Sequence, residues 1–124
     1  LLKCYRFKTI HIQIAISKYY SEFLHFQNLL KVNINTEYLV QFYADKLFMS
    51  SKKLNTITKE ILGSSVKKII SDIRTLKIKR SLLDLSQSIK EIAFEFGFDE
   101  HTNFVKFFKK QAGISPSDFR ELNQ

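Results

Sequence analysis

Residues that interrupt helices are scarce in this sequence of 124 residues, which has three glycines and one proline. Glycine and proline are the commonest residues in turns and at helix ends, so regular structure has few places to stop. The positions are Gly63, Gly97, Gly113 and Pro116. We therefore expect an all-α fold.

Cysteine is equally scarce, since Cys4 is the only one. A single thiol excludes an internal disulfide, and no group of cysteine and histidine residues has the spacing of a zinc site. This cysteine usage fits a reducing, cytoplasmic setting. The sequence predicts neither a metal nor a cofactor.

Long apolar runs and the signatures of common catalytic sites are also missing. The longest uncharged apolar run near the start, Thr9–Ser17, is far shorter than the roughly 20 residues that span a bilayer, so we expect no membrane helix and no signal peptide. Cys4 has no neighbouring base, and the chain has no glycine-rich phosphate loop and no isolated carboxylate pair. We predict that the chain is not an enzyme.

Positive charge is abundant, with a net charge of +8 and a pI near 9.6. This balance favours a polyanionic partner, most often nucleic acid, although lysines also serve solubility alone. The segment 63–90 sums to +5. Its cations either lie near phosphates or form a solvated face, and they include Lys67, Lys68, Arg74, Lys77, Lys79 and Arg80.

A helix-turn-helix pattern occupies the segment from Val40 to Gly63. One face of the first helix is formed by apolar residues at helical spacing, namely Val40, Tyr43, Ala44 and Leu47. After a turn, Ser50 is placed to cap a second helix and Gly63 to end it in a left-handed conformation. The buried stripe of that helix is predicted to be Leu54, Ile57, Thr58 and Ile61.

The same pattern recurs 49 residues later. The first stripe is repeated by Ile89, Ile92, Ala93 and Phe96, and Ser88 with Glu91 forms a capping-box pattern. The turn after Gly97 is one residue longer, so an offset of 50 then applies. With that offset the second helix matches Leu54, Ile57, Thr58 and Gly63 with Phe104, Phe107, Phe108 and Gly113.

Two further helices are predicted outside the copies. An amphipathic helix of roughly 30 Å, reaching to about Leu85, would set the distance between the copies. Its apolar residues are Val66, Ile69, Ile70, Ile73, Leu76 and Leu83. In the first thirty residues, Ile10, Ile12, Ile14 and Ile16 alternate as in a strand, whereas the lack of glycine and proline favours the helix that we expect.

The second helix of each copy has a polar face opposite its buried stripe. In the first copy this face carries Lys52, Asn55, Thr56 and Lys59, and in the second copy Thr102, Val105, Lys106 and Lys109. Short polar side chains read base edges in a major groove, and cations bind phosphates. A solvated lysine face is the plainer interpretation of one such helix, but its repetition favours DNA binding.

The second copy reads "IKEIAFEFGF" from Ile89 and continues with Phe104, Lys106, "FKK" at 108–110, Gly113, "SP" at 115–116 and Arg120. This pattern resembles the C-terminal signature of the arabinose-regulator (AraC/XylS) family of bacterial transcription factors. The first copy, with "FYADKLFMSSKKL" at 42–54 and "KR" at 79–80, is similar to the family's more variable first unit. The resemblance covers roughly residues 26–120.

The resemblance implies two homeodomain-like helix-turn-helix subdomains joined by a linker helix, each offering a recognition helix to successive major-groove faces of one DNA site. The implied base-contacting residues are Lys52, Asn55, Thr56, His101, Thr102, Val105 and Lys106, and the implied phosphate contacts are Lys59 and Lys109. For His101, a local hydrogen bond at the helix start is the alternative. Thr56 replaces a frequent arginine of the family, and Thr58 its usual buried phenylalanine.

These observations predict a DNA-binding transcriptional regulator with four parts. Residues 1–25 form a helical connector to an N-terminal sensing domain, 26–65 the first subdomain, 66–86 the linker helix and 87–124 the second subdomain. Double-stranded DNA is the expected partner, together with RNA polymerase or an N-terminal effector or dimerisation domain, and no membrane. The alternative is a helical protein-interaction module of the same fold without specific DNA binding.

Overall fold

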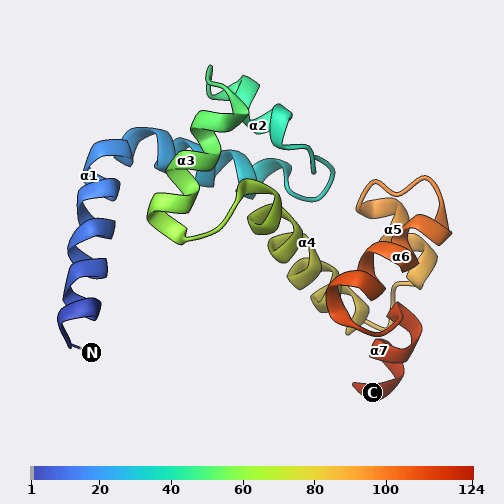
Figure 1. The fold of residues 1–124 in the computed structure, drawn as a ribbon. Coiled ribbons are helices and arrows are strands. Elements are labelled where there is room, and N and C mark those ends of the chain that lie inside the picture. Colours follow the sequence, from blue (N-terminus) through green and yellow to red (C-terminus); the bar gives the residue numbers. More distant parts are fainter. Residues whose placement is uncertain (1) are drawn as a thin grey trace. The chain divides into compact units, whose positions relative to one another are not determined.

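The computed structural model describes the backbone of residues 2–124 and the side chains of residues 8–124. Within these residues the chain is all-α, as predicted, with seven helices and no strand (Figure 1). The helices are α1 (Leu2–Asn33), α2 (Val40–Lys46), α3 (Ser51–Leu62), α4 (Val66–Leu82), α5 (Ile89–Glu95), α6 (His101–Ala112) and α7 (Pro116–Leu122). None of the helices in the described part is long and apolar enough to cross a membrane.

The helices form two compact units. The first unit contains α1 together with Leu39–Ile69, and the second contains Ile34–Tyr38 together with Ile70–Gln124. Helix α4 contributes its first residues to the first unit and the rest to the second.

Helix α1 confirms the helical prediction for the first thirty residues and also supplies core residues to the first unit. It bends at Tyr19, whose φ of −115° and ψ of 20° are not helical (Figure 1). Around the bend, Ala15 is buried against Ile57 and Ile61 of α3. Further along α1, the ring of Phe26 meets that of Tyr43 in α2 edge to face at 5.9 Å. The segment predicted as a connector therefore packs against the first helix-turn-helix.

The first helix-turn-helix has the predicted elements. The Ser50 hydroxyl accepts a hydrogen bond from the Lys53 backbone N–H, and Gly63 ends α3 with a φ of 72°. The buried residues of α3 are the predicted ones, Leu54, Ile57, Thr58 and Ile61. In the turn, Phe48 is left-handed with a φ of 56°.

The second unit is built around aromatic rings. Its capping box is present, because Ser88 and Glu91 exchange both hydrogen bonds, and Gly97 and Gly113 have positive φ as expected. The buried core contains residues of α4, α5 and α6 and Phe96, the C-cap residue of α5. Its members are Ile78, Leu82, Ile92, Ala93, Phe96, Phe104 and Phe108. Phe107, predicted as core, is partly buried at its edge.

The buried stripe of α4 differs from the prediction. Leu76 and Leu83 are half or more exposed, at 50% and 54%. Val66 and Ile70 are buried as predicted. From them the buried side chains continue at an interval of four residues with Arg74, Ile78 and Leu82, and Thr75 lies beside them. The prediction was wrong for Leu76 and Leu83 because the charged Arg74 interrupts the apolar series at this interval, and the prediction left out Ile78 and Leu82 beyond it.

Helix α4 also ends at Leu82, earlier than the predicted end near Leu85. The Arg120 guanidinium of α7 donates hydrogen bonds to the backbone oxygens of Leu82, at 2.8 Å, and Asp84, at 3.2 Å. Asp84 accepts hydrogen bonds from the hydroxyl and backbone N–H of Ser86, which lower the pKa of its carboxyl group. These contacts turn the chain toward α5.

Candidate nucleic-acid interface

The first candidate face lies on α3, opposite its buried stripe. Lys52, Thr56 and Lys59 are exposed on it, as the sequence predicts. The Thr56 hydroxyl donates a hydrogen bond to the Lys52 backbone oxygen at 3.0 Å, and the same hydroxyl oxygen keeps its capacity to accept hydrogen bonds. Two ammonium groups and one hydroxyl oxygen therefore extend from one side of a helix held by its apolar side.

Asn55, the fourth candidate on α3, has a different environment. Its side chain is half-buried, and its Oδ1 accepts a hydrogen bond from the Val66 backbone N–H at 2.9 Å. Val66 is the first residue of α4. The sequence analysis missed this contact, because it joins residues 11 positions apart through a loop.

The second candidate face lies on α6. His101, Thr102, Lys106 and Lys109 are exposed there, whereas Val105 is half-buried. Behind this face, Phe104 and Phe108 are fully buried, with ring centroids 6.5 Å apart. Rigid packing on one side of the helix fixes the direction of the polar side chains on the other.

Lys110 is an exposed cation that the sequence analysis left out of the second face. It follows Lys106 by four residues, so both side chains extend from the same side of α6. The position that matches it in α3 is Glu60. A search for lysines at this four-residue spacing would have found it, and it makes the second face more cationic than the first at this point.

The basic residues of α4 divide into exposed and enclosed groups. Lys67, Lys68 and Arg80 are exposed, whereas Lys77 and Lys79 are half-buried. Lys79 lies over the ring of Phe119, 5.8 Å from its centroid. For the exposed residues, both predicted roles remain open, as phosphate contacts or as a solvated face.

Arg74 does not belong to that set, which corrects the sequence interpretation. Its side chain is 3% exposed, and its guanidinium lies 5.1–5.6 Å from the ring centroids of Tyr38, Phe98 and Phe107. Its Nη2 also donates a hydrogen bond to the Phe96 backbone oxygen at 2.5 Å. Arginine stacks on aromatic faces more readily than lysine does, so this cation holds the core of the second unit together.

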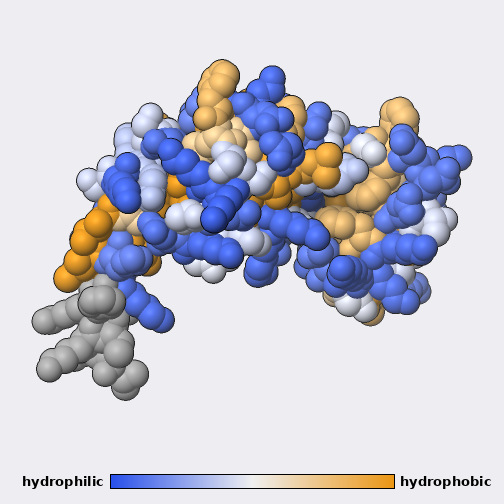
Figure 2. Space-filling model, turned by 45° about the horizontal axis from the view of Figure 1, so that its top comes forward, coloured by the Kyte–Doolittle hydropathy of each residue, from blue (hydrophilic) through white to orange (hydrophobic). Residues whose placement is uncertain are grey.

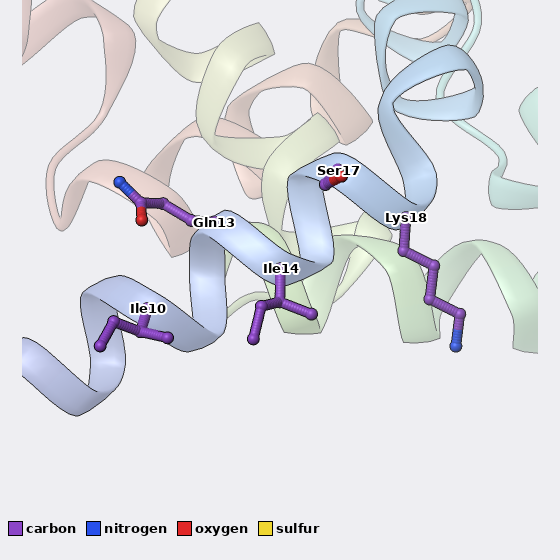
Figure 3. A pocket seen from close by; sticks show the side chains of 5 residues that line it. All are labelled: Ile10, Gln13, Ile14, Ser17 and Lys18. Atoms are coloured by element: carbon purple, nitrogen blue, oxygen red, sulfur yellow. The ribbon is translucent and has the colours of Figure 1, made fainter.

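Surface hollows that involve α1 occur in the first unit, and Lys59 of the first face lines one of them. One is lined by α1, through Ile10, Gln13, Ile14, Ser17 and Lys18 (Figure 3). In Figure 3, Ile14 and Lys18 extend from the same side of the helix, and all of the lining residues that the structure describes come from this one helix. Another, of about 410 Å³, lies between the side chains of Lys8, His11 and Ile12 and the end of α3 at 59–63.

Figure 2 shows a hydrophobic patch on the described part of α1, and much of the remaining surface in the same view is hydrophilic, with smaller hydrophobic areas between. Ile10 and Ile14 are 56% and 63% exposed there. Among the described residues, no group of three or more histidine, cysteine, aspartate or glutamate side chains is placed to hold a metal ion. The polar features that remain are the two helical faces and the exposed cations of α4.

Comparison with known proteins agrees with these two helix-turn-helix units. A family model described as a helix-turn-helix domain, of the AraC/XylS type, matches residues 43–122. The chain belongs to the AraC/XylS family. That match covers α2 from Tyr43 onward, all of α3 to α6, and α7.

Relatives and solved structures of the AraC/XylS type agree with this family membership. The probable transcription factor PqrA of Proteus vulgaris is 32% identical over 78 residues, which are 63% of this chain and 64% of that protein. The chain thus spans less than two thirds of this relative's length. The C-terminal domain of the response regulator yesN from Fusobacterium nucleatum superposes with a TM-score of 0.70 at 27% identity, covering 77% of this chain and 93% of that one.

A second solved structure shows the same fold. It is the DNA-binding domain of AdpA, a global transcriptional factor, in complex with a target DNA, with a TM-score of 0.66 at 21% identity. The match covers 78% of this chain and 90% of the AdpA domain.

Proposed function

We propose that this chain is the DNA-binding part of a transcriptional regulator that reads an operator with two recognition helices, α3 and α6. The two helices enter successive major-groove faces of one site, about 34 Å or one helical turn apart. The observation that carries the proposal is the repeated polar face. Helix α3 buries four side chains and α6 buries two, and each helix exposes lysines and hydroxyl groups on the opposite side. Family membership supports it.

Base edges are read by side chains near the start of each helix, and phosphates are bound further along it. In this proposal Lys52 and Thr56 read bases from α3, while His101, Thr102 and Lys106 do so from α6. The half-buried Asn55 and Val105 stand at the edges of the two faces. Lys59 and Lys109, in the last turn of each helix, bind phosphates.

A pair of lysine variants in α6 tests these roles. Lys106→Ala is expected to weaken operator binding by about 1–3 kcal/mol and to relax discrimination at one base pair. Lys109→Ala is expected to weaken binding to all sequences and to reduce the slope of affinity against salt by about one. The measurement is a salt titration of binding to the operator, to its single-base variants and to random duplex, with Lys31→Ala in α1 as an exposed-lysine control.

The operator for this titration comes from selection of bound sequences out of a random DNA pool. Equal losses of Lys106→Ala on the operator and on random duplex would contradict its base-reading role. If the wild-type chain selects no sequence from the pool at about 0.1 M salt, the helical protein-interaction module replaces the proposed function.

Partners other than DNA belong to the same proposal. We infer that the regulator acts in the cytoplasm and contacts RNA polymerase or works with an effector or dimerisation domain, because some relatives, such as the melibiose operon regulatory protein of Escherichia coli, of which the match covers 34%, are much longer than the matched segment. Helix α1 then has two roles, as a connector and as a core element of the first unit. Transcription from an operator-bearing template, with and without the chain, measures whether binding affects the polymerase.

A further inference from the structure

The junction between α3 and α4 contains a buried backbone donor. Val66 begins α4, its side chain is fully buried, and its N–H lies in the first turn, where a helix offers no acceptor. The acceptor comes from Asn55, whose Oδ1 lies 2.9 Å from the Val66 nitrogen. A buried N–H without a partner is costly, so this contact stabilises the junction.

The second unit has the same junction without this hydrogen bond. The offset of 50 that relates α3 to α6 places Val105 at the position of Asn55, and Pro116 at the position of Val66. Pro116 begins α7 and is buried, and proline has no N–H to satisfy.

The residue before this position has the same role in both junctions. The Ser65 hydroxyl accepts a hydrogen bond from the Lys68 backbone N–H at 3.2 Å, and the Ser115 hydroxyl accepts one from the Asp118 backbone N–H at 3.1 Å. The local helix start is therefore similar. In one junction an amide side chain satisfies a buried donor, and in the other the donor does not exist.

We propose that Asn55 is a positioning residue that holds the start of α4 against the recognition helix α3, and that it does not read a base. The proposal rests on the function proposed above. An asparagine that recognises adenine uses both its carbonyl oxygen and its amide nitrogen on one base edge. Because the oxygen of Asn55 is bonded to the Val66 N–H in the half-buried junction, that two-point contact is not available to it.

Hydrogen exchange of the Val66 amide tests the contact directly. Asn55→Val removes the acceptor and is expected to accelerate exchange at Val66 by about tenfold or more. Asn55→Asp keeps an acceptor oxygen and is expected to leave the exchange rate within about twofold of wild type. Thr56→Val, on the exposed face one residue away, is the matched control. Unchanged exchange at Val66 in Asn55→Val would overturn the proposal.

DNA binding distinguishes positioning from base reading. Asn55→Val is expected to lose about tenfold in affinity for the operator and for each of its single-base variants alike. Asn55→Val combined with Val66→Pro recreates the junction of the second unit, removes the unsatisfied donor, and is expected to restore affinity to within about threefold of wild type. A base-reading asparagine would instead lose discrimination at one base pair, and the proline would not restore it.

The design remains informative if Asn55→Val alone fails to fold. The double variant is then expected to fold, because it contains no buried donor at this position, and failure of the double variant while Val66→Pro alone folds would overturn the proposal. If wild type shows no preference for any DNA sequence, the proposed function fails, while the exchange measurement still decides the role of the Asn55–Val66 contact.

Discussion

The two helix-turn-helix units share one pattern but fill their cores with different side chains. At equivalent positions of the recognition helices, the first unit buries Thr58 and the second buries Phe108, both fully. The Thr58 hydroxyl donates a hydrogen bond to the Asn55 backbone oxygen, so its polar group is satisfied within α3. The first unit therefore has no aromatic ring at this position of its recognition helix.

In the first unit, α1 packs against the buried side of α3. Ala15 is buried against Ile57 and Ile61, and Tyr19 and Phe23 pack against the same cluster. The second unit relies instead on aromatic rings of its own recognition helix and of the neighbouring segments. The ring centroids of Phe108 and Phe119 are 5.7 Å apart, and those of Phe98 and Phe104 are 5.4 Å apart. The comparison shows that a helix-turn-helix depends less on particular core residues than on a filled space behind the recognition helix.

The largest expected loss of stability tests this comparison at the equivalent positions 58 and 108. Phe108→Ala should destabilise the second unit by about 3–5 kcal/mol, because it removes a buried ring and leaves a cavity. Thr58→Ala should cost the first unit only about 1 kcal/mol, since it deletes a small group and one hydrogen bond within the helix. Urea unfolding followed by circular dichroism measures both, and equal losses would show that the two positions do not differ in this way.

Arg74 gives the next largest effect, and it belongs to the second unit alone. Arg74→Ala should destabilise that unit by about 3 kcal/mol, through the lost hydrogen bond to the Phe96 oxygen and the lost contacts with three aromatic rings. Arg80→Ala, at an exposed position of the same helix, is the control and should change stability by less than about 0.5 kcal/mol. Similar small losses for both variants would mean that the buried arginine adds nothing to the core.

The sequence predicted helices α1 to α6 and both helix-turn-helix units, but not α7, because the signals of the predicted elements are local. Ser50, Ser88 and Glu91 cap helices by contacts within three residues, and Gly63 and Gly113 end helices by their own φ. The stripe of α3 was predicted in full, since its apolar residues follow the helical period and Thr58 is the one polar exception. Such features need no knowledge of the rest of the fold.

The errors and omissions concern contacts between distant segments. Arg74 was assigned to the charged surface, but rings from other elements enclose it. The end of α4 at Leu82 depends on Arg120, 38 residues later, and the bond of Asn55 depends on where α4 begins. In the candidate site the sequence therefore predicted which side chains are exposed more reliably than what the half-buried ones contact.

The smallest expected effects sharpen the comparison at the turn between the two helices of each unit. Phe48 is left-handed and 95% exposed, whereas its equivalent Gly97 has a φ of 82° without a side chain. Left-handed backbone costs a non-glycine residue about 1–2 kcal/mol, while glycine loses roughly 0.5–1 kcal/mol more conformational freedom on folding. Phe48→Gly should therefore stabilise the first unit by about 0.5–1 kcal/mol.

Gly97→Ala should have the opposite sign and destabilise the second unit by about 1–2 kcal/mol. A Cβ at Gly97 would lie 3.7 Å from the backbone of Thr36, an ordinary contact distance, so the cost comes from the backbone conformation and not from crowding. Thermal unfolding of both variants measures the pair. If Phe48→Gly lowers the melting temperature, the exposed ring stabilises the turn by contacts that outweigh the left-handed strain, and the two turns then differ in what holds them and not only in which residue occupies them.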